Sequence, residues 1–271
     1  MDKTIYLPYG AIEMEPAFPS TNMGFQSVKE VLDRRESYPE LRGWMGNNEL
    51  MLLQFPRSFY FLNSLWDAQY SEKKEEDVLK EISGHLYIDH KDLIANSYLA
   101  LQETDPEKIA STLSSLNALT QPGANLRGGS VGRFLFPDSL IVIRSLQLQL
   151  EIRLARQRLL KALEENPDKK QCELLVSNYL DKLLRWNQET GWEKTIDINI
   201  WRTPIYERDK ALSEGMVQLK HVLADGKPYA SYDQIEDFFE PIKRKLLNKY
   251  PKNSVMIGCI EPFKLSVLQS Q

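Results

Sequence analysis

The segment from Asp138 to Glu165 places the strongest constraint on the fold of this chain. Its sequence, DSLIVIRSLQLQLEIRLARQRLLKALEE, predicts one helix of about 28 residues, which would be roughly 42 Å long at 1.5 Å per residue. Apolar residues surround most of the helix axis as far as Leu154. A helix that is apolar nearly all round usually lies at the centre of a helical array. Asp138 is placed to cap this helix, and Asn166-Pro167 ends it.

Apolar residues at helical spacing continue over most of the remaining chain and predict about eight or nine helices in all. Short apolar and β-branched runs at 3–7, 49–55 and 254–260 predict a small group of strands supplied by the two chain ends. Residues 195–203 are compatible with either strand or loop. The expected fold is therefore mainly α, an irregular multi-helix array around the long central helix with a few short strands.

The composition changes near residue 70, which bears on the domain organisation. Residues 1–70 mix strand-like and helical stretches, whereas residues 71–271 are almost entirely helical in pattern. We therefore predict a small α/β segment over 1–70 and a helical domain over 71–271, with one continuous domain as the alternative.

Composition and charge exclude several classes of function. The formal net charge is -4 and no basic stripe carries interleaved aromatic residues, so no nucleic-acid partner is expected. No apolar run approaches the roughly 18 to 20 residues that cross a bilayer, so no membrane partner is expected. The first residues, MDKTIYLPYGAIEMEP, have acids and prolines where a secretory signal needs a basic start and an apolar core. A cytoplasmic protein is expected, unless a signal peptide precedes the sequence given.

No metal site is predicted from the histidines and cysteines. His85 and His90 are five residues apart across a predicted helix break, and His221 lies far from both in the sequence, so no ligand spacing is present. Cys172 and Cys259 each lie in apolar surroundings, which favours buried free thiols over a disulfide. The sequence therefore predicts neither a metal nor a redox centre.

The glycine-rich segment RGGSVGRF, residues 127–134, raises the question of a phosphate-binding loop. A P-loop requires a Gly-Lys-Ser/Thr sequence, and a dinucleotide fingerprint requires a preceding strand, and neither is present. We interpret the segment as a flexible connection between helices, and no cofactor is predicted. The alternative is a mobile loop that offers Arg127 or Arg133 to an anionic ligand.

The segment RGWMGNNELMLLQFPRSFYFLNSLWDA, residues 42–68, gathers side chains suited to a sugar. Sugars present hydroxyl groups and apolar faces, so an aromatic ring beside amide and charged groups can bind them. Glycines flank the Trp44 region, and glycine lets the backbone come close to a ligand. We predict a sugar-binding edge over residues 42–57, called the Trp44 edge below, and its predicted substrate-binding residues are Trp44, Asn47, Asn48, Glu49 and Arg57. A well-packed turn is the alternative.

Other aromatic and acidic residues have different predicted roles. Trp66 shares a helical apolar face with Phe59 and Leu62, so we predict that it is part of the core. Glycosidic cleavage needs two carboxyl groups across one sugar, and the loop acids Glu13, Glu15 and Glu49 are open to that role or to plain solvation. Trp192 and Trp201 flank an irregular stretch, and their roles stay open.

The order of features over about residues 40–105 resembles the exit from the (β/α)8 barrel of certain glycoside hydrolases. In that family a Trp-Asp-Pro phrase follows the last barrel helix, and an acidic helix and a Tyr/Phe-Gly phrase lead into a helical domain. Here the corresponding stretch is LWDAQYSEKKEEDVLKEISGHLYIDH, with Ala68 in place of the proline and no glycine in 85–88.

This resemblance implies that the chain corresponds to the last barrel strands and the post-barrel helical domain of such an enzyme. Trp44 to Glu49 would then lie near the C-terminal ends of barrel strands, where barrel enzymes bind substrate. The acids that usually catalyse the reaction would lie on strands outside this chain, so no catalytic residue is assigned.

Two classes of function stay open at this point. The first is a carbohydrate-related module, glycoside hydrolase-like if it is an enzyme, that binds a sugar at the Trp44 edge. The second is a non-enzymatic helical scaffold that binds a protein partner through a helix face or beside the loop at 120–137. A small-molecule hydrolase with carboxylates from distant segments is a third possibility.

Overall fold

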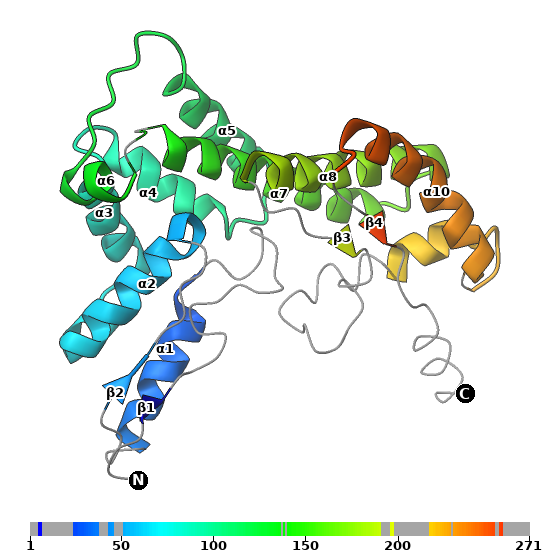
Figure 1. Ribbon diagram of the computed structural model, residues 1–271. Helices are drawn as coiled ribbons and strands as arrows, with labels where there is room; N and C mark the ends of the chain where they lie inside the picture. The colour runs from blue at the N-terminus through cyan, green and yellow to red at the C-terminus, as the bar shows by residue number, and fades with distance from the viewer. Residues whose placement is uncertain are drawn as a thin grey trace. The chain divides into compact units, whose positions relative to one another are not determined.

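The computed structural model describes residues 5–6, 24–37, 43–45, 51–136, 138, 140–190, 196–197, 217–228, 230–252 and 255–256. The chain divides into two compact units, Met1–Leu150 and Glu151–Gln271. Helices dominate the described part of both units, which confirms the mainly α fold (Figure 1). The boundary that the sequence predicts near residue 70 lies inside the first unit. No described helix has both the length and the apolar character that crossing a bilayer requires.

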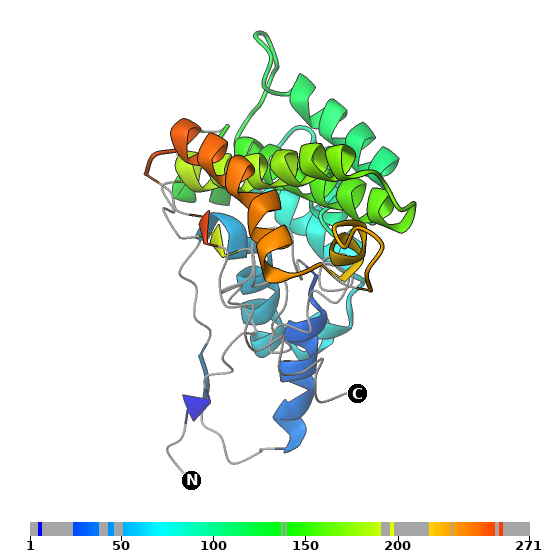
Figure 2. The ribbon, with the colours of Figure 1, turned by 90° about the vertical axis from the view of Figure 1, so that its right-hand side faces the viewer.

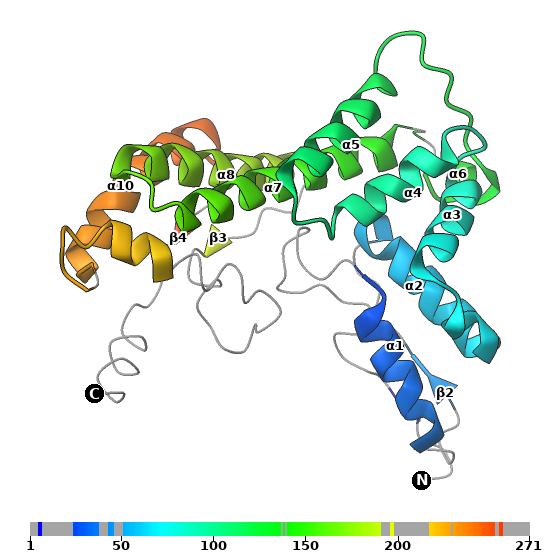
Figure 3. The ribbon, with the colours of Figure 1, turned by 180° about the vertical axis from the view of Figure 1, so that it is seen from behind.

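The first unit begins with alternating strands and helices and continues with helices alone. Its described elements are β1 (Ile5–Tyr6), α1 (Gln26–Asp33), η1 (Arg34–Ser37), β2 (Gly43–Trp44), α2 (Met51–Trp66), η2 (Ala68–Glu72), α3 (Glu75–Leu86), α4 (Lys91–Ala100), α5 (Pro106–Ala118) and α6 (Ser130–Leu135). Helix α1 packs against α2, α2 against α3, α3 against α4 and α6, and α4 against α5 (Figure 3). The boundary between the units falls within α7 (Ile141–Glu164).

The strands of the first unit form a parallel pair. Ile5 is paired with Gly43 and Tyr6 with Trp44, and α1 lies in the connection between the two strands. Parallel strands need such a crossover because the C-terminal end of the first strand and the N-terminal end of the second lie at opposite ends of the pair. Helix α2 then follows β2, so residues 5–66 have the order of two successive βα units.

The prediction of a buried strand at 49–55 is wrong, because the described part of that run is helical. Residues 51–55 form the first turns of α2, which continues through Pro56 to Trp66. Gln54, Phe55, Arg57 and Ser58 are all buried, so the run has neighbours on nearly every side and shows no helical period. A short apolar run of this kind does not distinguish a buried strand from a buried helix.

The predicted single group of strands is also wrong in its pairing. The described residues contain two separate parallel pairs: β1 with β2, and β3 (Ile196–Asp197) with β4 (Val255–Met256). The chain ends therefore contribute strands, as predicted, but to different pairs. Residues 263–268, for which the sequence leaves pairing open, lie outside the described residues.

The described second unit is built from the C-terminal part of α7, α8 (Lys169–Thr190), a helical segment at 217–222 and α10 (Tyr232–Lys249). Helix α10 packs against α8 (Figure 2). The Lys249 ammonium and the Tyr250 hydroxyl both bind one carboxylate oxygen of Asp181, at 2.6 and 3.1 Å. These contacts fasten the C-terminal end of α10 to α8.

Helix α7 has the character that the sequence predicts for 138–165. It runs from Ile141 to Glu164, and side chains are buried around most of its circumference in both units. In the second unit, Glu151 of α7 binds Lys182 and Arg185 of α8 at 2.8 and 3.0 Å. The pair of cations on one half-buried carboxylate sets the register of α8 along α7.

Trp66 is not part of the core, contrary to the prediction. It is the last residue of α2, and its side chain is 95% exposed. The helical spacing with Phe59 and Leu62 is present, but both Leu62 and Trp66 are left exposed. Periodicity shows which face of a helix is apolar, and it does not show how much of that face is covered.

Candidate functional site

Trp44 lies at the C-terminal end of β2 and is half-buried. The next residue, Met45, is exposed. Asn47, Asn48 and Glu49 lie outside the described residues, as do the loop acids Glu13 and Glu15. In parallel α/β structures the connections that follow the C-terminal ends of strands carry the ligand-binding residues. The described geometry puts Trp44 and the start of the β2–α2 connection at that end of the strand pair.

Arg57 lies on α2 inside the first unit, with only 2% of its surface exposed. One of its guanidinium nitrogens donates a hydrogen bond to the hydroxyl oxygen of Ser27, in the first turn of α1. The structure therefore describes Arg57 as a buried residue with a contact inside the protein. Its contact with a sugar stays a prediction, and its described contact joins α2 to α1.

The start of α1 is held by contacts with α2 and η2. The rings of Phe25 and Tyr60 stack with centroids 4.5 Å apart and planes 10° from parallel. The Lys29 ammonium lies 3.4 Å from the carboxylate of Glu72 in η2. These contacts fix the start of α1 against α2 and η2.

Glu75, in the first turn of α3, belongs to the same support. Its carboxylate accepts a hydrogen bond of 2.5 Å from the side-chain amide of Gln102. Burial raises the pKa of the Glu75 carboxyl, while the bonds from Gln102 and from the backbone of Phe25 and the nearby charge of Arg57 oppose that rise. Because its oxygens are engaged within the protein, we assign Glu75 a structural role in holding α1 to α3 and α4.

The glycine-rich segment 127–134 is a close packing contact. A methyl group on Gly129 or Gly132 would lie 2.3 Å from the carbonyl oxygen of His85 or 2.1 Å from that of Leu86. Arg127 binds Asp89 through two hydrogen bonds of 2.8 Å, and these bonds hold the pKa of Asp89 below its ordinary value. The segment thus joins α6 to the end of α3, and the described contact of Arg127 is with Asp89.

Residues 128–132, GGSVG, also match the Gly-x-Ser-x-Gly pattern of serine hydrolases. In those enzymes the serine occupies a strained turn and hydrogen-bonds a histidine. Ser130 is exposed and is the first residue of α6. Its φ is negative, so its backbone does not have the strained conformation of a nucleophile turn. No hydrogen bond joins it to a histidine in the part of the chain that the structure describes. Of the two glycines of this motif, Gly128 and Gly132, Gly132 is accounted for by its packing against the Leu86 carbonyl oxygen.

The described histidines have contacts that do not form a metal site. The ring of His85 lies against Phe59 with centroids 5.4 Å apart, and Nε2 of His90 is 3.2 Å from the carbonyl oxygen of Asn125. Over the described ranges, no three His, Cys, Asp or Glu side chains gather closely enough to hold a metal ion.

Cys172 is a buried free thiol on α8, as predicted, and Cys259 lies outside the described residues. Burial raises the pKa of the Cys172 thiol from 9.0 to about 11. Thiolate is the reactive form, and two pH units correspond to about a hundredfold less thiolate. As the pH rises from 9 to 11, the Cys172 thiol ionises in the unfolded chain but stays protonated in the folded chain. The unfolded state therefore gains stability, and the contribution of Cys172 to the free energy of unfolding decreases.

We expect iodoacetamide to alkylate Cys172 at least about a hundredfold more slowly in the folded protein than in the denatured protein at mildly alkaline pH. A Cys259→Ser background isolates the signal, and mass spectrometry after proteolysis measures the modified fraction. Equal rates in the two states would contradict the buried, protonated thiol.

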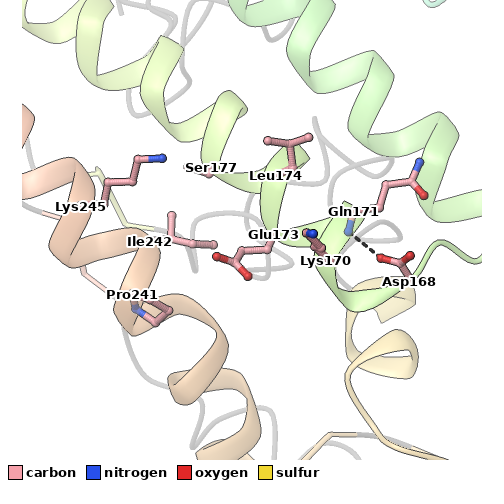
Figure 4. Close-up of a pocket in the computed structure, with 9 residues that line it drawn as sticks. All are labelled: Asp168, Lys170, Gln171, Glu173, Leu174, Ser177, Pro241, Ile242 and Lys245. Carbon is pink, nitrogen blue, oxygen red and sulfur yellow. Dashed lines mark hydrogen bonds between the residues drawn. The ribbon is translucent and has the colours of Figure 1, made fainter.

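A groove of about 450 Å³ lies in the second unit between α8 and α10 (Figure 4). Leu174, Pro241 and Ile242 are its apolar residues, and Lys170, Glu173 and Lys245 bring charges of both signs. The Asp168 carboxylate is engaged by the backbone N–H of Gln171 at 2.7 Å. None of the residues predicted to bind sugar lines this groove.

Comparisons with known proteins give no relative of this chain. No family model matches the sequence, and no curated protein and no solved structure matches it. The chemistry of the Trp44 edge therefore rests on its own residues and geometry.

Proposed function

We propose that the chain is a carbohydrate-related module that binds a sugar at the Trp44 edge. One observation carries the proposal: Trp44 is the last residue of β2 in a parallel β1–α1–β2–α2 arrangement. Ligands of parallel α/β proteins bind beyond the C-terminal ends of the strands. Trp44 offers an aromatic face there, and the connection that it begins carries Asn47, Asn48 and Glu49.

The residue types of the edge support this ligand class. A sugar ring has an apolar face, which can stack on an indole, and hydroxyl groups, which bond to amides and carboxylates. Arg57 has a supporting role in this proposal, because its guanidinium ties α2 to the first turn of α1. This bond joins the helices that precede and follow β2 in the sequence.

The order of two βα units followed by helices is also the order that the glycoside hydrolase resemblance implies. That agreement supports a relation to the C-terminal region of such an enzyme as part of the proposal. No catalytic acid is assigned, and the Glu75 carboxylate, which binds the Gln102 amide, has a structural role. The proposed activity of this chain is binding.

A protein-interaction scaffold is the second candidate function, and a different observation favours it. Leu62 and Trp66 form an apolar part of α2 that the described structure leaves exposed. Large exposed apolar groups that lie together often mark an interaction surface. This surface is on α2 and does not include Trp44.

A thermal-shift screen with monosaccharides and oligosaccharides tests the proposal. We expect at least one sugar to raise the melting temperature of the wild type by binding the folded state. Trp44→Ala is expected to weaken that binding about tenfold or more, which corresponds to a loss of about 1.4 kcal/mol.

Trp66→Ala is the matched control. It makes the same chemical change at an exposed tryptophan of the same unit that lies outside the Trp44 edge. It should bind the sugar as the wild type does. No shift with any sugar contradicts the proposed function. A shift that is lost in Trp66→Ala and kept in Trp44→Ala contradicts the proposed site.

A further inference from the structure

We draw no further inference here: the strongest candidate, the groove of the second unit between α8 and α10, combines the apolar residues Leu174 and Ile242 with charges of both signs, and nothing in the described structure shows what covers it.

Discussion

Replacing Gly132 with alanine is expected to lower the free energy of unfolding by about 2–3 kcal/mol. The added methyl group would lie 2.1 Å from the carbonyl oxygen of Leu86, and 2.9 Å from its carbonyl carbon. Both atoms belong to backbone, so a side-chain rotation cannot relieve the clash. Helix α6 would have to move away from the end of α3, and the contact between Gly129 N–H and Leu86 carbonyl, at 2.8 Å, would weaken with it.

Gly84→Ala is the matched control for this prediction. Gly84 lies in α3, and nothing comes within 4 Å of a methyl group added there. Alanine favours a helix over glycine, so Gly84→Ala should stabilise the protein by about 0.5–1 kcal/mol. Urea unfolding followed by circular dichroism measures both changes. Equal stability of Gly132→Ala and the wild type would contradict the packing role of the glycine-rich segment.

Leu180→Ala is expected to cost about 3 kcal/mol, because it removes buried carbon atoms and leaves a cavity in the second unit. Leu180 on α8 is fully buried. Leu174, on the same helix, is 71% exposed at the groove between α8 and α10. Leu174→Ala is the same chemical change and should alter stability by less than about 0.5 kcal/mol.

Chemical denaturation of the two leucine variants measures the difference. Both substitutions occur in the same helix and have the same effect on helix propensity, so their difference isolates burial. Similar losses for the two variants would contradict the described orientation of α8. A large loss in Leu174→Ala alone would mean that the groove face of α8 is the buried one.

The sequence predicts an element of the fold correctly where the residues of that element alone determine its structure. Helix α7 is apolar around most of its axis, and Asn166-Pro167 follows its end, so its position and burial could be predicted. The strand at 3–7 is present in its centre as β1. Its partner, Gly43–Trp44, could not be predicted because a two-residue strand has no period to detect.

Two errors on α2 have a common cause. The sequence predicts a strand at 49–55 and a core position for Trp66, and both predictions depend on which neighbours surround the helix. Gln54 to Ser58 are buried, whereas the side chain of Trp66 is 95% exposed. Burial of a helix is set by tertiary contacts, and a single sequence shows only the apolar pattern.

At the candidate site, too, the features set by neighbouring residues could be predicted, and those set by tertiary contacts could not. The glycines beside Trp44 indicate a turn at which the backbone can come close to a ligand, and this could be predicted. The burial of Arg57 and its bond to Ser27, 30 residues away, could not. A weak signal was present, because Arg57 is the single charge in a helix that is otherwise apolar or neutral. Such a charge is often buried with a partner.

Hydrogen–deuterium exchange of the full chain tests the central claim, sugar binding at the Trp44 edge, most directly. The protein is measured alone and with the oligosaccharide that gives the largest thermal shift. Exchange is expected to slow in the peptides that cover Gly43 to the first turn of α2, and this protection should be lost in Trp44→Ala. Protection confined to other segments, or a protein that no sugar stabilises, would contradict the account.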